Sequence, residues 1–81
     1  MKIIKFSSSF CGSCRKLDAI LQVANLIPDE EILITTDDLE LARRYNISAF
    51  PTLLKLDDNE LEIDRISGLV PLSKLKEFFA R

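Results

Sequence analysis

Two cysteines separated by two residues are the most reactive feature of the sequence. They form Cys11-Gly12-Ser13-Cys14, and the 81-residue chain has no other cysteine and no histidine. Residues three apart on a helix share a face, so the two sulfurs can close a small ring. In the chain-entropy model a disulfide closing so short a loop adds only about 2 kcal/mol of stability before strain is subtracted. The pair therefore favours reversible redox chemistry over a purely structural cross-link.

Zinc binding is the main alternative for such a pair. Structural zinc takes four ligands, normally cysteine or histidine. A monomer of this chain could complete the site only with carboxylates, and a sulfur-only site would need a second chain, so we expect no metal. The missing histidine also excludes hydrolases that use Ser-His or Cys-His nucleophilic pairs.

The composition predicts one globular domain over residues 1–81, with 47% hydrophobic residues to form a core. A formal net charge of −2 with interspersed signs gives no basic surface for nucleic acid. The sequence has neither a signal-peptide core nor an apolar run long enough for a membrane span, so we expect a cytoplasmic protein. In a reducing cytosol such a cysteine pair is more often catalytic or metal-binding than structural.

The elements around the cysteines alternate in type. Residues 2–6 read as a buried strand ended by three serines, and apolar residues at helical spacing follow from Cys14 to Ala24, in a helix beginning at or near Cys11. The remaining predictions are a strand over 31–36, a short helix capped by Asp37 or Asp38 and running to Tyr45, strands over 52–56 and 61–67 around a turn at 57–60, and a helix started by Pro71.

The order β-α-β-α-β-β-α predicts a small α/β sheet. We expect the first crossovers to be parallel and right-handed and the final hairpin to be antiparallel. Ligands and chemistry gather at the carboxyl ends of strands in such sheets. Cys11 occupies that position after the first strand.

Three motifs in order resemble the thioredoxin family. They are Cys11-Gly12-Ser13-Cys14 after the first strand, the segment from Tyr45 to Leu53 with Phe50-Pro51-Thr52, and Gly68 seven residues before Leu75-Lys76-Glu77-Phe78. The resemblance covers nearly the whole chain, which is similar to a minimal, glutaredoxin-sized form lacking the usual first strand and helix. It implies a thioredoxin-like fold, with a four-stranded mixed sheet flanked by three helices.

The resemblance also implies roles for individual residues. Cys11 would be the exposed attacking cysteine and Cys14 the less exposed resolving cysteine, which together form the redox disulfide. Pro51 would be a cis-proline, and the backbone of Phe50 would receive an extended substrate segment. The docking surface would comprise Phe10, Gly12, Phe50, Pro51, Gly68 and Leu69. Taken alone, Phe10 also reads as a core residue at a strand end, and Gly68 as a residue that ends a strand or allows a close turn.

The implied activity is reduction of protein disulfides in cell redox homeostasis and electron transport. No cofactor would be bound, because electrons would come from NADPH through thioredoxin reductase or a similar enzyme. The partners would be disulfide-containing proteins, with ribonucleotide reductase as one candidate, and we expect a monomer.

Two residues depart from the thioredoxin pattern. Ser13 stands where the family has proline. Unlike proline, Ser13 contributes an N–H and a hydroxyl, and extra hydrogen bonding near Cys11 favours a less reducing potential. Lys5, six residues before Cys11, stands where the family has a buried acid that is thought to help deprotonate the resolving cysteine. Lys5 either extends to the surface or lowers the pKa of the Cys14 thiol as a nearby cation.

Two other functions remain as alternatives. A glutaredoxin-type reductase would use glutathione. Gly68 is followed by Leu69-Val70-Pro71 rather than by the Gly-Gly and acidic pair with which glutaredoxins hold glutathione, and Ser8 and Ser9 stand just ahead of Cys11, where glutaredoxins have a lysine. A non-catalytic binding module would keep the fold and bind through Phe10, Phe50 and Gly68. Such a module would need neither cysteine.

Overall fold

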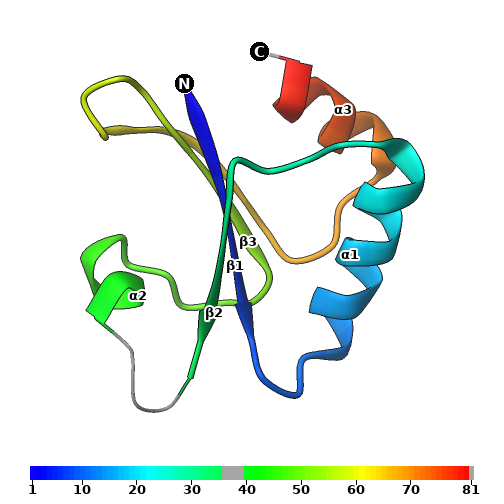
Figure 1. Cartoon of the computed structure of the whole chain (residues 1–81), viewed down its shortest axis with the longest axis horizontal. Coiled ribbons are helices and arrows are strands. Elements are labelled where there is room, and N and C mark those ends of the chain that lie inside the picture. The colour runs from blue at the N-terminus through cyan, green and yellow to red at the C-terminus, as the bar shows by residue number, and fades with distance from the viewer. Residues whose placement is uncertain (36–39, 81) are drawn as a thin grey trace.

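The computed structural model describes residues 1–35 and 40–80. Along the chain it contains β1 (Lys2–Ser8), α1 (Gly12–Ala24), β2 (Glu30–Ile34), α2 (Glu40–Arg44), β3 (Thr52–Leu56), β4 (Glu62–Ser67) and α3 (Leu72–Ala80), as Figure 1 shows. This order confirms the predicted β-α-β-α-β-β-α arrangement.

The four strands form one mixed sheet in the order β2-β1-β3-β4. β2 is parallel to β1, whereas β3 is antiparallel to β1 and β4 is antiparallel to β3. The prediction of parallel first crossovers is therefore right for the connection from β1 to β2 and wrong for that from β2 to β3.

The ends of the strands explain this difference. β2 ends where Ile34 pairs with Ser8, and β3 begins where Thr52 pairs with Phe6, so both positions lie at the carboxyl end of β1. The five residues of α2 rise only about 7.5 Å. A five-residue strand spans roughly 17 Å. The connection through α2 returns the chain to the carboxyl end of β1, where Thr52 pairs with Phe6, so β3 runs antiparallel to β1.

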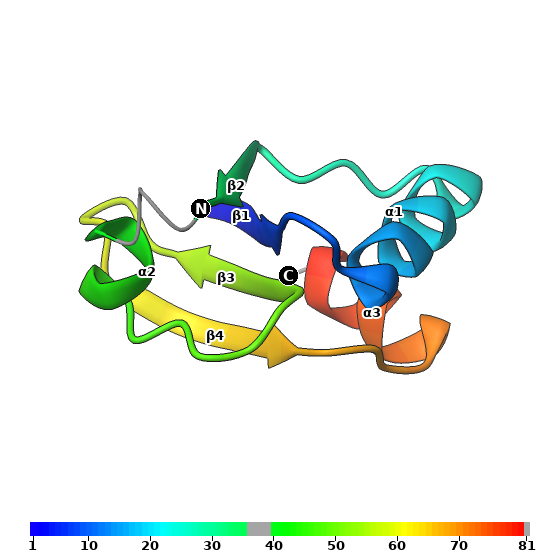
Figure 2. The ribbon, with the colours of Figure 1, turned by 90° about the horizontal axis from the view of Figure 1, so that it is seen from below.

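Helices cover both faces of the sheet, and each face carries its own hydrophobic core. Figure 2 shows α1 and α3 on one side and α2 on the other. Apolar side chains alternate between the two faces along each strand, as the pleat requires. The core under α1 and α3 contains Ile3, Leu17, Leu21, Leu53, Leu75 and Phe78, and the core under α2 contains Ile4, Phe6, Ile34, Ala42, Ile47, Leu54 and Leu56.

Most predicted element boundaries agree with the structure. α1 begins directly after Cys11, which is its N-cap, and ends at Asn25, whose left-handed φ of 57° closes the helix. β1 extends through Ser8 rather than stopping before Ser7, because the pairing with β2 continues to Ser8. The predicted caps Asp37 and Asp38 lie outside the described residues. No helix in the described parts of the chain is long and apolar enough to span a membrane.

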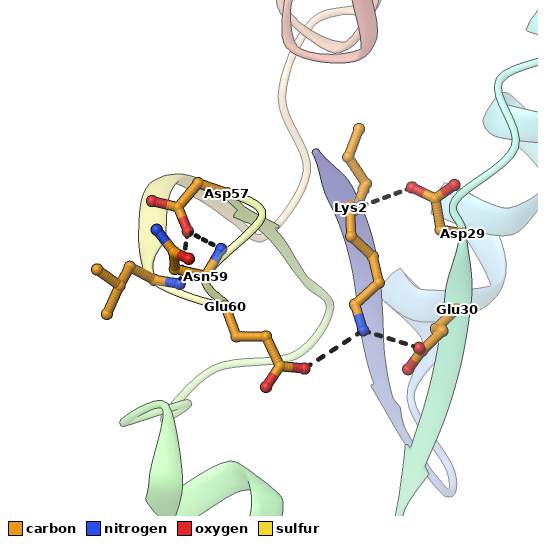
Figure 3. A network of polar contacts seen from close by, with 8 residues as sticks. Lys2, Asp29, Glu30, Asp57, Asn59 and Glu60 are labelled. Carbon is orange, nitrogen blue, oxygen red and sulfur yellow. Dashed lines mark hydrogen bonds and ion pairs between the residues drawn. The ribbon is translucent and has the colours of Figure 1, made fainter.

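Polar contacts fix the turn between β3 and β4 and the start of β1 (Figure 3). Asp57 Oδ1 accepts hydrogen bonds from the backbone N–H groups of Asn59 (2.8 Å) and Leu61 (3.0 Å), the pattern of an Asx turn. Lys2 Nζ lies between Glu30 of β2, at 3.0 Å, and Glu60 of the turn, at 3.8 Å. These exposed ion pairs lie at the opposite end of β1 from the cysteines.

Candidate active site

The two cysteines lie where β1 passes into α1. They form a disulfide with a Cα–Cα separation of 5.2 Å, within the range usual for such bonds. Cys11 is half-buried, whereas Cys14 is only 4% exposed. Cys11 is thus more exposed than Cys14, which is the difference that the resemblance to thioredoxins implies for an attacking and a resolving cysteine.

Helix geometry places Cys11 in a favourable electrostatic position. Its backbone is extended (φ −110°, ψ 104°), and its Sγ accepts a hydrogen bond from the Cys14 N–H at 3.2 Å. The N-terminus of a helix carries partial positive charge and free N–H groups, which stabilise an anion. No acidic residue lies in the first turn of α1 to offset this field. The site would therefore favour the thiolate form of Cys11 once the disulfide is reduced.

Backbone contacts bring two further segments to the same end of the sheet. Thr52 at the start of β3 pairs with both Phe6 of β1 and Ser67 of β4. The peptide bond before Pro51 is cis, and the Pro51 carbonyl accepts a hydrogen bond from the Gly68 N–H at 2.8 Å. Gly68 follows the last residue of β4 and has a φ of +77°, a conformation in which glycine is free of strain. The segments around Pro51 and Gly68 are therefore joined beside the carboxyl end of β1, from which the chain enters α1.

The candidate docking residues differ widely in exposure. Phe10 is fully exposed, at 101% of its reference area, and has a left-handed φ of 58°. Its interpretation as a core residue at a strand end is therefore wrong, because the turn after β1 directs the ring into solvent. Leu69 and Gly12 are also accessible, whereas Phe50 is half-buried against the core under α2. An aromatic ring with no burial contributes little to stability and is available for contact with a partner.

Lys5 lies within the sheet face that α1 covers, and its side chain is only 5% exposed. Its Nζ donates a hydrogen bond to Asp18 of α1 and lies 3.1 Å from Glu31 of β2. The prediction that Lys5 extends to the surface is wrong, because two partly exposed carboxylates reach inward and pair with it. Burial acts to lower the pKa of Lys5, but the hydrogen bonds and negative charges of Asp18 and Glu31 outweigh it and raise that pKa. Lys5 therefore stays charged at neutral pH.

Sequence reasoning missed the partners of this lysine and a second buried lysine. Lys55 of β3 is 3% exposed, lies 4.5 Å from the centre of the Phe78 ring, and donates to the Phe78 carbonyl. The sequence does contain a signal for the burial of both lysines, because each lies between apolar core residues within its strand. Strand periodicity places such a side chain on a buried face but does not name the acceptor that meets it.

Comparison with known proteins identifies the family. A family model described as Thioredoxin matches residues 1–81. The chain belongs to the thioredoxin family. It is 36% identical over 69 residues to a thioredoxin H-type from Oryza sativa subsp. indica, an alignment that covers 82% of this chain and 56% of that thioredoxin. It is 30% identical over 79 residues to chloroplastic thioredoxin Y2 from Arabidopsis thaliana, covering 93% and 47%. The chain spans about half the length of these curated thioredoxins.

Solved thioredoxin structures share the arrangement of strands and helices. Fasciola hepatica thioredoxin superposes with a TM-score of 0.66 at 29% identity, covering 96% of this chain and 76% of that one. Plasmodium falciparum thioredoxin gives a TM-score of 0.73 at 18% identity, covering 98% and 82%, and so supports the fold alone. The predicted thioredoxin-like α/β fold, with a four-stranded mixed sheet and three helices, is confirmed.

Proposed function

We propose that this chain is a thiol-disulfide oxidoreductase that reduces disulfide bonds in proteins by dithiol exchange. The observation that carries the proposal is the Cys11–Cys14 disulfide at the N-terminus of α1, with one sulfur accessible and the other buried. Membership of the thioredoxin family supports it. The site needs no bound cofactor, because the two sulfurs hold the transferred electron pair.

In the first step, the accessible Cys11 attacks a disulfide of the partner. Its thiolate forms a bond to one partner sulfur, and the other partner sulfur leaves as a thiolate that takes up a proton. The dipole and free N–H groups at the N-terminus of α1 favour the thiolate form of Cys11. The result is a mixed disulfide between Cys11 and the partner.

In the second step, Cys14 releases the partner. Cys14 loses its proton and attacks the Cys11 sulfur, and the second partner thiolate leaves and is protonated. Because both cysteines belong to one helical turn, this attack is intramolecular and has a high effective concentration. Two electrons and two protons have then passed to the partner, and the Cys11–Cys14 disulfide has formed.

The partner would dock on the surface around the two cysteines. An extended substrate segment would lie against the backbone of Phe50 beside Pro51, which the Gly68 amide holds in place. Apolar contacts would come from the accessible side chains of Phe10 and Leu69, with the bare backbone of Gly12 allowing close approach. A surface built mainly from backbone and apolar groups would accept many protein sequences.

Turnover requires that an external enzyme reopen the Cys11–Cys14 disulfide. We infer that the electrons come from NADPH through thioredoxin reductase or a similar enzyme. The substrates would be disulfide-containing proteins, with ribonucleotide reductase as one candidate. Ser13 adds an N–H and a hydroxyl that a proline spacer would lack, and hydrogen bonding from them near Cys11 would stabilise the thiolate and make the dithiol a weaker reductant.

Reduction of insulin disulfides tests the proposal directly. The purified chain is assayed with NADPH and thioredoxin reductase, and in parallel with glutathione, glutathione reductase and NADPH. We expect NADPH consumption that depends on the chain in the first system and only background in the second. Activity with glutathione alone would show a glutaredoxin-type enzyme. Activity in neither system would contradict the proposal and leave a binding module.

Lys5 provides a second prediction, which concerns the resolving thiol. Asp18, which pairs with Lys5, lies one helical turn after Cys14 on α1. In a Lys5→Met variant Asp18 and Glu31 would lose their buried counter-ion, and their negative charge would raise the pKa of the Cys14 thiol. In a Cys11→Ser background, the pH midpoint of Cys14 alkylation is therefore expected to move upward.

The Lys5→Met/Asp18→Asn double variant is the matched control. It removes the carboxylate nearest to Cys14 along the helix together with the lysine, so the alkylation midpoint should return toward that of the Cys11→Ser parent. A midpoint that Lys5→Met leaves unchanged would show that Lys5 does not act on Cys14.

A further inference from the structure

Arg65 lies on β4, at one edge of the sheet, and its side chain contacts the backbone directly after α2. Its guanidinium donates hydrogen bonds to two backbone carbonyls directly after α2, Tyr45 O at 2.7 Å and Asn46 O at 3.3 Å. Nineteen and twenty residues of sequence separate these partners from Arg65. A side chain from one strand thus holds the end of a short helix that belongs to another part of the chain.

The guanidinium is itself held in one orientation. Glu62, on the same strand, accepts from Arg65 Nε and from one terminal nitrogen, both at 2.6 Å. This two-point pairing between guanidinium and carboxylate fixes the plane of the Arg65 group. The fork that faces Tyr45 and Asn46 is therefore pre-oriented rather than free to rotate.

The carbonyls that Arg65 binds begin the segment that carries Pro51. Asn46 has a left-handed φ of 55° and closes α2. The Ile47 N–H bonds to the Ala42 carbonyl at 2.7 Å, which turns the chain toward Pro51. Further along, the Ala49 carbonyl accepts from Thr52 Oγ1 at 2.7 Å, and Gly68 holds the Pro51 carbonyl.

From these contacts we infer that Arg65 is a positioning residue for the backbone that receives the protein substrate. The inference rests on the proposed function, because the docking role given there belongs to the backbone of Phe50 beside Pro51, at the end of the segment that follows Asn46. The hydrogen bonds of the Arg65 side chain go to Glu62, Tyr45 and Asn46 and to neither cysteine. Arg65 would therefore govern how well a protein substrate is held and leave the thiol chemistry itself unchanged.

The test compares a protein disulfide with a small one. KM and kcat are measured for insulin and for 5,5′-dithiobis(2-nitrobenzoic acid), whose disulfide needs no extended docking surface. Loss of a positioning contact can cost up to about 100-fold when reacting groups are displaced by 1 Å. For Arg65→Gln we expect KM for insulin to rise by about 5–20-fold at nearly constant kcat, with the rate on the small disulfide within about twofold.

Two further variants test whether the effect is graded, and a third is the control. Arg65→Lys keeps the charge but loses the fork and should give an intermediate KM. Glu62→Gln keeps Arg65 but weakens its orientation and should shift KM in the same direction by less. Lys76→Gln makes the same charge change at an exposed position of α3 and should leave both substrates unaffected.

Amide hydrogen exchange separates this inference from the proposed function. Arg65→Gln should speed exchange at the Ile47 amide, which lies next to the anchored carbonyls, while the Leu17 and Leu21 amides of α1 remain protected. If the wild-type chain reduces neither substrate, the proposed function fails, and the exchange result still decides whether Arg65 orders the segment. Equal losses on insulin and the small disulfide, unchanged kinetics, or a variant that does not fold would overturn the positioning role.

Discussion

Replacing Cys11 with serine is expected to reduce insulin reduction by about 10³-fold or more, because the covalent mechanism then loses its nucleophile. A serine hydroxyl cannot form the mixed disulfide. Cys14 is 4% exposed, so it cannot take over the attack on a large partner. The measurement is NADPH consumption with insulin and thioredoxin reductase. Retention of more than a tenth of the activity would show that Cys11 is not the attacking residue.

The Cys14→Ser variant should fail at a different step. Cys11 remains half-exposed at the helix N-terminus, so the first exchange still takes place. With no resolving thiol, the mixed disulfide should accumulate and appear on a non-reducing gel as a covalent adduct that dithiothreitol removes. Ser73→Ala, at an exposed position of α3, is the control and should form no adduct and keep full turnover. Adducts from Cys11→Ser instead would reverse the two assigned roles.

Truncating Phe6 to alanine is expected to destabilise the fold by about 3–5 kcal/mol, the usual cost of removing a buried phenylalanine ring. Phe6 is 0% exposed and lies in the core under α2, with its ring centre 6.2 Å from that of Tyr45. Domains of this size have a total free energy of unfolding of about 4–12 kcal/mol, so the loss is a large part of it. The midpoint of thermal unfolding should fall by more than about 12 °C.

Phe10→Ala is the matched control for this stability prediction. It removes the same ring four residues later, but from a side chain that is fully exposed. The change in free energy of unfolding should therefore stay within about 0.5 kcal/mol. If Phe10 belongs to the docking surface, the same variant should still raise KM for insulin. A stability loss for Phe10→Ala comparable to that of Phe6→Ala would contradict the placement of the Phe10 ring in solvent.

Local patterns predict the elements of this fold well. In α1, apolar residues recur at helical spacing and Asn25 supplies a left-handed cap, so both ends of the helix can be located from nearby residues alone. β3 coincides with its predicted range, 52–56, because Pro51 and the turn at 57–60 bound it on both sides. The direction of β3 is a different kind of property. It depends on the end of the sheet to which α2 returns the chain, and hydrophobic periodicity does not record that.

The candidate site also combines local features, which the sequence predicts, with contacts between distant residues, which it does not. The cysteine pair and its position after a strand are local features, because the reactive atoms are named by residue type and lie within one helical turn. The partners of Lys5 and Arg65 are not local. Lys5 of β1 forms ion pairs with Asp18 of α1 and Glu31 of β2, and Arg65 donates a hydrogen bond to the Tyr45 carbonyl, twenty residues away in the sequence. The charge of Lys5 or Arg65 does not predict which of the many carboxylates and carbonyls in the chain it will contact.

The sequence by itself limited the candidate chemistry to two sulfurs, because Cys11 and Cys14 are its only cysteines and it contains no histidine. It also determined the order of strands and helices, since these form from periodicity and capping within short stretches of chain. Only the tertiary structure decided that Phe10 lies in solvent, that Lys5 is buried between two carboxylates, and that Arg65 holds the segment before Pro51. The contacts of Lys5 and Arg65 join residues that are distant in the sequence, and whether a side chain such as that of Phe10 is buried is settled only when the elements pack against one another.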